Sequence, residues 1–110
     1  MAGKPFEDRI VGQLSSLGDI TRRAMFGGHG LYWDGVIFAI VFRDRLFLKV
    51  DEASKADYLA KGMEPFRPNG RQTLKSYYEV PPEVLEDRES LLSWAGEAIR
   101  AGQATGGPRR

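Results

Sequence analysis

The sequence predicts an α+β fold of two layers, in which an antiparallel sheet carries its helices on one face. Segments with helical spacing of apolar residues stand at both ends of the chain and near its middle. Between them lie segments with the two-residue alternation of strands. Short turn signals such as Asp34-Gly35 separate these strands, so sequential strands are expected to be antiparallel. The expected order is α-β(3)-α-β(2)-α.

The composition is typical of one soluble globular domain. Of the 110 residues, 42% are hydrophobic and 28% are charged, so a single core can form without disulfides or metal ions. We expect this domain to span residues 1–101. Residues 102–110 are rich in glycine and other small or polar residues and end in two arginines, which predicts a disordered tail.

Charge and cysteine content narrow the possible functions. The net charge of +1 neither requires nor excludes nucleic acid as a partner. The absence of cysteine excludes disulfides, thiolate catalysis and cysteine-based metal sites. The first residues lack the apolar core of a signal peptide, and the longest apolar run, Val36 to Phe42, is too short to cross a membrane. A cytoplasmic protein without membrane contact is therefore expected.

The first helix and the first strand are expected before residue 34. Apolar residues recur on one helical stripe from about Pro5 to Leu17, and Gly18 is suited to end the helix. Residues 22–35 are rich in glycine, yet they alternate as strands do on both sides of the glycines. We interpret these residues as a long first strand with a bulge or kink at its glycines.

Two more strands complete the first part of the sheet. Val36 to Phe42 follow the Asp34-Gly35 turn and are all apolar, which is typical of a central strand that is covered on both faces. Arg43-Asp44 is expected to form the next turn. The following strand alternates and directs three apolar side chains toward the helices, namely Leu46, Leu48 and Val50.

The second half of the chain predicts a helix, a hairpin and a closing helix. Asp51 can cap a helix from about Glu52 to Lys61. Residues 63–67 and 73–80 form the expected hairpin, and two prolines place its first strand at a sheet edge. Asp87 can cap the last helix, whose apolar stripe is expected to close over the sheet.

The glycine-rich residues do not match a nucleotide-binding loop. A phosphate-binding loop needs a lysine and a hydroxyl residue after its glycines, and a dinucleotide fingerprint opens a helix, whereas Gly30 is followed by a strand. His29 is the only histidine, and the sequence offers neither a second His or Cys for a metal site nor a recognisable nucleophile. We expect His29 to be an exposed turn residue, and we expect no catalytic residue, no metal and no cofactor.

Successive side chains of a strand point to opposite faces of the sheet, which we call strand parity. This alternation places aromatic and basic residues together on the sheet face opposite the helices. Such a face suits a protein partner or a second copy of the chain, a plain half-exposed sheet, or single-stranded nucleic acid. The first is preferred, because the strand from Val36 to Phe42 is apolar on both sides and needs a cover. The candidate binding residues are Arg22, Arg23, His29, Tyr32, Phe47, Lys49, Lys75 and Tyr77.

Five segments, in order over roughly residues 6 to 101, carry a family resemblance. They are Arg23-Ala24-Met25-Phe26-Gly27-Gly28-His29-Gly30-Leu31-Tyr32, Asp34-Gly35-Val36-Ile37-Phe38-Ala39, Leu46-Phe47-Leu48-Lys49-Val50-Asp51, Tyr77-Tyr78-Glu79-Val80-Pro81 and Leu91-Leu92-Ser93-Trp94-Ala95. Together they resemble the N-terminal domain of the TfoX/Sxy competence regulators. The resemblance implies a two-layer fold similar to secretion chaperones. It also implies a bacterial regulator that promotes expression of DNA-uptake genes together with the cyclic-AMP receptor protein.

The sequence is therefore compatible with three functions. The first is a non-enzymatic regulatory or protein-interaction module linked to the transcription machinery, which acts through the open sheet face and includes the case of a homodimer. The second is direct binding of nucleic acid through basic and aromatic residues, namely Arg22, Arg23, Lys49, Lys75 and Tyr77. The third is a small-molecule or enzymatic role at the glycine-rich residues.

Overall fold

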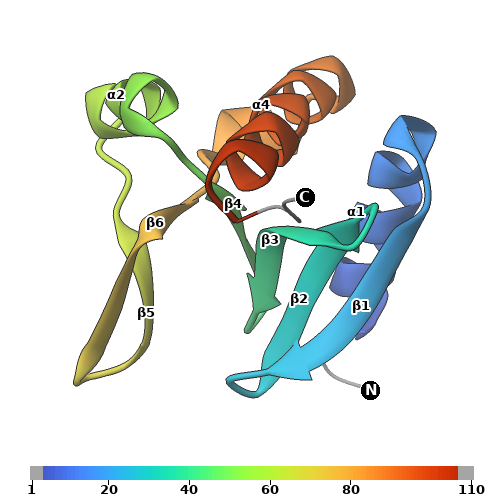
Figure 1. Cartoon of the computed structure of the whole chain (residues 1–110), viewed down its shortest axis with the longest axis horizontal. Helices are drawn as coiled ribbons and strands as arrows, with labels where there is room; N and C mark the ends of the chain where they lie inside the picture. The colour runs from blue at the N-terminus through green and yellow to red at the C-terminus, as the bar shows by residue number, and fades with distance from the viewer. Residues whose placement is uncertain (1–3, 107–110) are drawn as a thin grey trace.

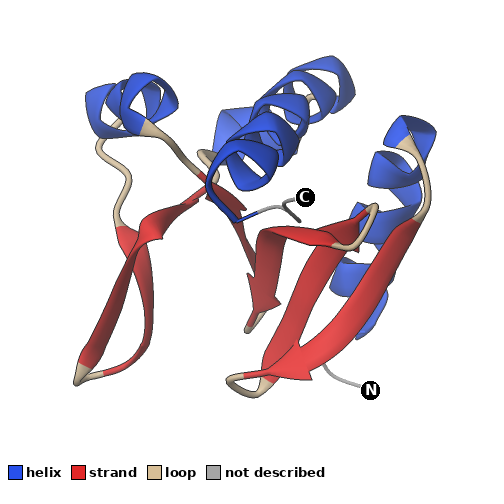
Figure 2. Ribbon diagram, viewed as in Figure 1, coloured by secondary structure: helices blue, strands red, loops and turns tan. Residues whose placement is uncertain are grey.

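A computed structural model describes residues 4–106, in which six strands form one antiparallel sheet and the helices form a second layer (Figures 1 and 2). The elements in chain order are α1 (Lys4–Leu14), the short 3-10 helix η1 (Ser15–Leu17), β1 (Ile20–Met25), β2 (Gly28–Trp33), β3 (Val36–Phe42), β4 (Arg45–Lys49), α2 (Glu52–Ala60), β5 (Pro65–Asn69), β6 (Gln72–Glu79), α3 (Pro82–Leu85) and α4 (Arg88–Gly106). The order of strands in the sheet is β1-β2-β3-β4-β6-β5. The α+β prediction is confirmed.

The main core lies between the sheet and the helices α1 and α4. Its most buried members come from both helices and from the central strands, and include Ile10, Leu14, Leu31, Phe38, Leu48, Leu91, Ala95 and Ala98. β3 has β2 and β4 as neighbours, as expected of a strand that is apolar throughout. β5 lies at the sheet edge, where Pro65 and Pro68 remove no hydrogen bond from a central ladder.

The glycine-rich residues form a hairpin, and the prediction of one long bulged strand is wrong. Phe26 and Gly27 have φ angles of 54° and 87° and connect β1 to β2, so four strands precede α2 where three were expected. A two-residue turn of this type needs positive φ angles at both residues. Phenylalanine rarely adopts a positive φ, so the sequence does not indicate a turn at Phe26. A bulge does occur, but it lies in β3, where Phe38 is inserted between the residues paired with Leu31 and Tyr32.

Gly28 is required because two backbones meet closely at this position. A Cβ atom added there would overlap the carbonyl oxygen of Val41 and would lie 3.1 Å from Cα of Phe42. Both atoms belong to the central strand β3. The glycine therefore permits the close approach of the two strands rather than a bulge.

The last helix is longer than the sequence predicts. α4 continues to Gly106, although a disordered tail was expected from Gly102. Gly102 is buried, and a Cβ there would lie 2.7 Å from the carbonyl oxygen of Ile37. The helix thus gains packing against β3 that its local composition does not reveal. Residues 107–110 of the predicted tail lie outside the described residues, and none of the described helices is long and apolar enough to cross a membrane.

The hairpin of β5 and β6 extends beyond the rest of the sheet. β6 pairs with β4 through three residues, Tyr77 to Glu79, and Val50 N donates a further backbone hydrogen bond to Ser76 O. The remainder of the hairpin packs on the sheet through side chains such as Phe66 and Leu74. We call residues 65–78 the arm. In Figure 1 the arm and the β1–β2 hairpin lie on either side of β3 and β4, and the sheet is bent between these two parts.

The predicted cap of α2 at Asp51 is confirmed, and its contribution to the stability of the fold is expected to depend on pH. The Asp51 side chain accepts a hydrogen bond from Ser54 N, and Ser54 Oγ accepts one from Asp51 N. The bond from the Ser54 backbone lowers the pKa of Asp51 below its ordinary value of 3.8. Because this pKa is lowered in the folded state, the ionised cap contributes stability above pH 3.8, and that contribution is lost as the pH falls through the folded pKa.

We expect Asp51→Ala to lower the melting temperature by about 4–8 °C at pH 7. The difference from the parent should shrink below pH 3.8, where the parent also loses the charge. Asp51→Asn keeps the acceptor oxygen without the charge and is the control, with a smaller loss at pH 7 that should also shrink as the parent loses its charge. Thermal unfolding followed by circular dichroism from pH 2 to 7 measures this. A difference for Asp51→Ala that stays constant over this range would contradict the account.

Candidate functional site

The second face of the sheet is closed by the chain itself, which corrects the expectation of an open aromatic face. Phe66 of the arm is fully buried there, and the rings of Phe26, Phe42 and Phe47 surround it at centroid distances of 5.8, 5.3 and 4.6 Å. Phe47 and Tyr77, which strand parity predicts to be exposed, have only 5% and 8% of their surface exposed. The parity itself is right, since both residues belong to this second cluster.

Four candidate binding residues are brought together at the border of this cluster. The guanidinium of Arg23 lies over the Tyr32 ring at 5.8 Å, and Lys49 Nζ lies over the Tyr77 ring at 5.2 Å. Burial raises the pKa of Tyr77 to about 12, and the nearby Tyr32 adds to the rise. Arg23 and Tyr32 come from β1 and β2, whereas Lys49 and Tyr77 come from β4 and β6. The bend of the sheet therefore assembles a row of two cations and two tyrosines, which we call the tyrosine row.

Lys75 is exposed on β6, in the part of the arm that is not paired with β4. Regular alternation along β6 would place Leu74 on the opposite face from Tyr77, but Leu74 packs in the second cluster together with Tyr77. Register irregularities between β5 and β6 break the alternation between these two residues. Simple parity therefore fails in the arm, and Lys75 is not placed in the tyrosine row.

Arg22 and His29 lie on the other face of the sheet, beneath α1, and not with the remaining candidates. Glu7 of α1 is only 4% exposed, and its two carboxylate oxygens lie 2.7 Å from Arg22 Nη1 and 2.9 Å from His29 Nδ1. Arg22 also donates to Asp8 at 2.8 Å. Hydrogen bonds to Asp8 and to Glu7 raise the pKa of Arg22.

This cluster accounts for the position of His29, which is a half-buried residue of β2 and not an exposed turn residue. The histidine joins β2 to α1 through a buried carboxylate. Sequence reasoning missed Glu7, because the residues it binds lie 15 and 22 positions further along the chain and no local pattern connects them. One signal was present: Glu7 stands on the helix that carries Phe6 and Ile10, next to the apolar stripe.

A double-mutant cycle on Glu7→Gln and His29→Asn should show that the two side chains are coupled. We expect each single variant to lower the free energy of unfolding, and a coupling energy of about 1–3 kcal/mol. Urea unfolding at pH 7 measures these values. Glu89→Gln, which changes an exposed acidic residue of α4, is the control and should be neutral. Additive effects of the two single variants would contradict the contact.

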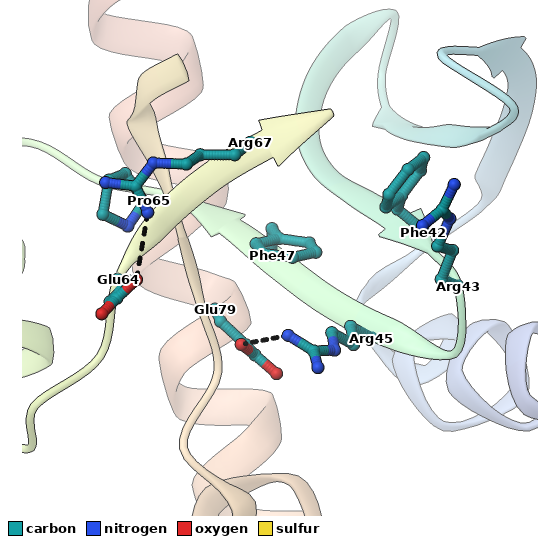
Figure 3. A pocket seen from close by; sticks show the side chains of 8 residues that line it. All are labelled: Phe42, Arg43, Arg45, Phe47, Glu64, Pro65, Arg67 and Glu79. Atoms are coloured by element: carbon teal, nitrogen blue, oxygen red, sulfur yellow. Dashed lines mark hydrogen bonds and ion pairs between the residues drawn. The ribbon is translucent and has the colours of Figure 1, made fainter. Parts of the chain in front are cut away.

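A groove opens between the β3–β4 turn and the arm, with a volume of about 380 Å³ (Figure 3). Its lining residues are Phe42, Arg43, Arg45, Phe47, Glu64, Pro65, Arg67 and Glu79. Phe47 is buried, and Phe42 and Pro65 are half-buried. The groove therefore combines an apolar floor with three arginines and two glutamates around it.

Two of the three arginines in the groove form ion pairs. Arg45 Nη1 lies 3.4 Å from Glu79 Oε1, and Arg67 Nη1 lies 3.0 Å from Glu64 Oε1, as the dashed lines of Figure 3 show. The third, Arg43, has its guanidinium over the Phe42 ring at 5.1 Å. Among the residues that the structure describes, no carboxylate forms an ion pair with Arg43.

Sequence reasoning identified only Phe47 among the residues of this groove. The groove forms where the bend of the sheet brings the arm toward β3 and β4, and strand periodicity does not predict that bend. The turn Arg43-Asp44 was the available signal, since it is a two-residue connection without glycine or asparagine. No group of three or more His, Cys, Asp and Glu residues able to hold a metal ion occurs within residues 4–106.

The fold and the site define a small two-layer α+β domain with helices on one sheet face and a basic, aromatic groove on the other. Residues 12–102 match the family described as the TfoX N-terminal domain. The chain belongs to this family, as the segments from Arg23 to Ala95 indicate.

A relative in Aliivibrio fischeri (strain ATCC 700601 / ES114) is named DNA transformation protein TfoX1. The two sequences are 30% identical over 95 residues, which cover 84% of this chain and 46% of the relative. The chain thus spans about half the length of the relative that it matches.

Proposed function

We propose that the chain is a non-enzymatic, cytoplasmic regulatory domain of competence that works by binding a partner protein, with the transcription machinery as the class of partner. Membership of the TfoX family supports a competence-related role, as does the name of the relative, which refers to DNA transformation. The groove is the observation that supports a protein contact. It has an apolar floor within a polar and charged rim, as protein–protein interfaces usually do.

Deletion of the coding sequence in the organism that encodes it tests this role. The expected result is a lower transformation frequency and lower transcript levels of DNA-uptake genes, both restored by the parent chain. A complementing variant with Arg43, Arg45 and Arg67 changed to glutamine should accumulate normally and fail to restore them. Unchanged transcript levels after deletion would contradict a regulatory role in competence.

The tyrosine row favours a second candidate function, the binding of single-stranded nucleic acid. The half-buried Tyr32 ring supplies stacking surface, and Arg23 and Lys49 supply positive charge beside it and the buried Tyr77 ring. Stacking surface with positive charge is the combination found on sheet-based binders of single strands. Such binding should weaken with salt, and log affinity should fall by about 0.7 per phosphate neutralised for each unit of log salt. A gel-shift or anisotropy titration at two salt concentrations measures this. Absence of any shift at low salt would exclude this function.

A homodimer of this chain would form through residues other than Phe47 and Tyr77 of the aromatic sheet face. Phe47 and Tyr77 are buried within the chain, whereas Phe26 at the β1–β2 turn has 42% of its surface exposed. Phe26 is therefore the residue to test in a self-contact. If the chain is a dimer through this turn, light scattering should report the dimer mass for the parent and the monomer mass for Phe26→Asn, which also suits the positive φ.

A further inference from the structure

We propose that the groove between the β3–β4 turn and the arm binds an extended acidic peptide segment of the partner protein, with one large apolar side chain of that segment seated on Phe42, Phe47 and Pro65 (Figure 3). This inference rests on the proposed function, because it gives the chemistry of the partner. Shape, charge and backbone conformation each support it.

The floor of the groove is already packed in the structure of the chain alone. The rings of Phe42 and Phe47 both pack against the fully buried Phe66, at 5.3 and 4.6 Å. Pro65 has a fixed φ and lies at the start of β5. A floor that is already ordered loses little conformational entropy when a side chain packs on it, so the apolar contact contributes to affinity.

The arginines of the groove have donors to spare. Each of the two ion pairs uses a single nitrogen of its guanidinium, Arg45 toward Glu79 and Arg67 toward Glu64, and a guanidinium carries five N–H groups. Both arginines are more than half exposed, and exposed ion pairs are weak, so a peptide carboxylate can share these donors at little cost. Arg43 has no such pair in the described part of the chain and is the main anchor for a carboxylate.

The positive charge continues from the groove along the arm. Residues 65–78 contain Arg67, Arg71 and Lys75 and no acidic residue, although the whole chain has a net charge of only +1. All three side chains are exposed. An extended acidic segment that enters the groove would therefore meet complementary charge over the length of the arm.

The two glutamates favour a peptide over nucleic acid as the occupant. Glu64 and Glu79 line the groove beside the arginines and would repel a continuous row of phosphates. A peptide can place its carboxylates at the arginines and its backbone N–H groups near the glutamates. The mixed lining of the groove therefore fits a segment in which acidic residues flank an apolar one.

The backbone at the β3–β4 turn supports a functional role for Arg43. Arg43 and Asp44 have φ angles of 52° and 60°, in the left-handed region that a bulky residue rarely adopts. The preceding turn uses Asp34-Gly35 at the same conformation, which is the favourable choice for stability. An arginine kept in an unfavourable backbone conformation at the edge of a groove indicates that its side chain is used there.

The test uses fluorescent twelve-residue peptides in which a central tryptophan, phenylalanine or leucine is flanked by aspartate and glutamate. Binding to the full chain is followed by anisotropy. One control set replaces every acidic residue by its amide, and a second set replaces the apolar residue by alanine. We expect at least one acidic peptide to bind about tenfold or more tightly than both of its controls. If no acidic peptide exceeds its controls, or if a labelled single-stranded DNA binds in the groove in their place, the inference is overturned.

Arg43→Asn separates binding from folding. Asparagine suits a positive φ, so the variant should melt at the same temperature as the parent or higher, yet bind the acidic peptide about fivefold or more weakly. Arg88→Gln removes an exposed arginine from the helical layer and should leave the affinity unchanged. Unchanged peptide affinity of Arg43→Asn would overturn the inference. Peptide binding and the transcript levels of DNA-uptake genes are measured separately, so failure of either the inference or the proposed function can be recognised.

Discussion

Gly28→Ala is expected to be one of the most damaging single substitutions in the chain, with a loss of about 3 kcal/mol in the free energy of unfolding. The added Cβ would overlap the carbonyl oxygen of Val41, which is part of the central strand β3. Backbone atoms in the middle of a sheet cannot move away as a flexible side chain can. β2 would have to separate from β3, and the ladder hydrogen bonds between them would be lost.

Gly12→Ala is the matched control for this substitution. Gly12 lies inside α1, is exposed, and has nothing within 4 Å of an added Cβ. Here alanine should raise the free energy of unfolding by about 0.5–1 kcal/mol, because glycine loses more conformational freedom on helix formation. Urea unfolding of the three proteins side by side measures both effects. Equal midpoints for Gly28→Ala and the parent would show that the two strands do not approach so closely.

Phe66→Ala should have an effect of similar size, about 3–5 kcal/mol, since it empties the centre of the second cluster. Phe66 is fully buried and contacts the rings of Phe26, Phe42 and Phe47. Once these contacts are lost, the backbone pairing of the arm with the rest of the sheet is limited to its base, from Ser76 to Tyr78. We therefore expect the arm to open locally as well as the whole domain to become less stable.

Hydrogen exchange can distinguish this local opening from global loss of stability. Amides of the arm and of the β3–β4 turn should exchange faster in Phe66→Ala than the reduced global stability alone requires, whereas amides of α4 should follow global unfolding. Leu59→Ala, on an exposed face of α2, is the control and should change stability by less than about 0.5 kcal/mol. Uniform acceleration across all elements would contradict the separate opening of the arm.

Local patterns in the sequence were sufficient for the layers and for most of the elements. The stripe of α1, the Asp34-Gly35 turn, the cap at Asp51 and the edge position of Pro65 each depend on residues close together in the chain, and the structure agrees with all four. Strand parity also placed Phe47 correctly on the face opposite the helices.

The features that were missed depend on contacts between distant parts of the chain. Glu7 is buried because Arg22 and His29 come from strands that fold beneath α1. Phe47 is buried because Phe66 arrives from the arm after the sheet bends. Neither the bend nor a turn that begins with Phe26 at positive φ has a signature in hydrophobic periodicity, since both are stabilised by tertiary packing against intrinsic preference.

The two outer strands of the sheet differ from the inner ones in a way that bears on self-assembly. β5 carries Pro65 and Pro68, which cannot donate backbone hydrogen bonds, and β1 carries Arg22 and Arg23. Two copies of β1 placed edge to edge in antiparallel register would bring their exposed Arg23 side chains together, whereas Arg22 is already paired with Glu7 and Asp8. Both outer strands are therefore poor templates for the addition of another strand.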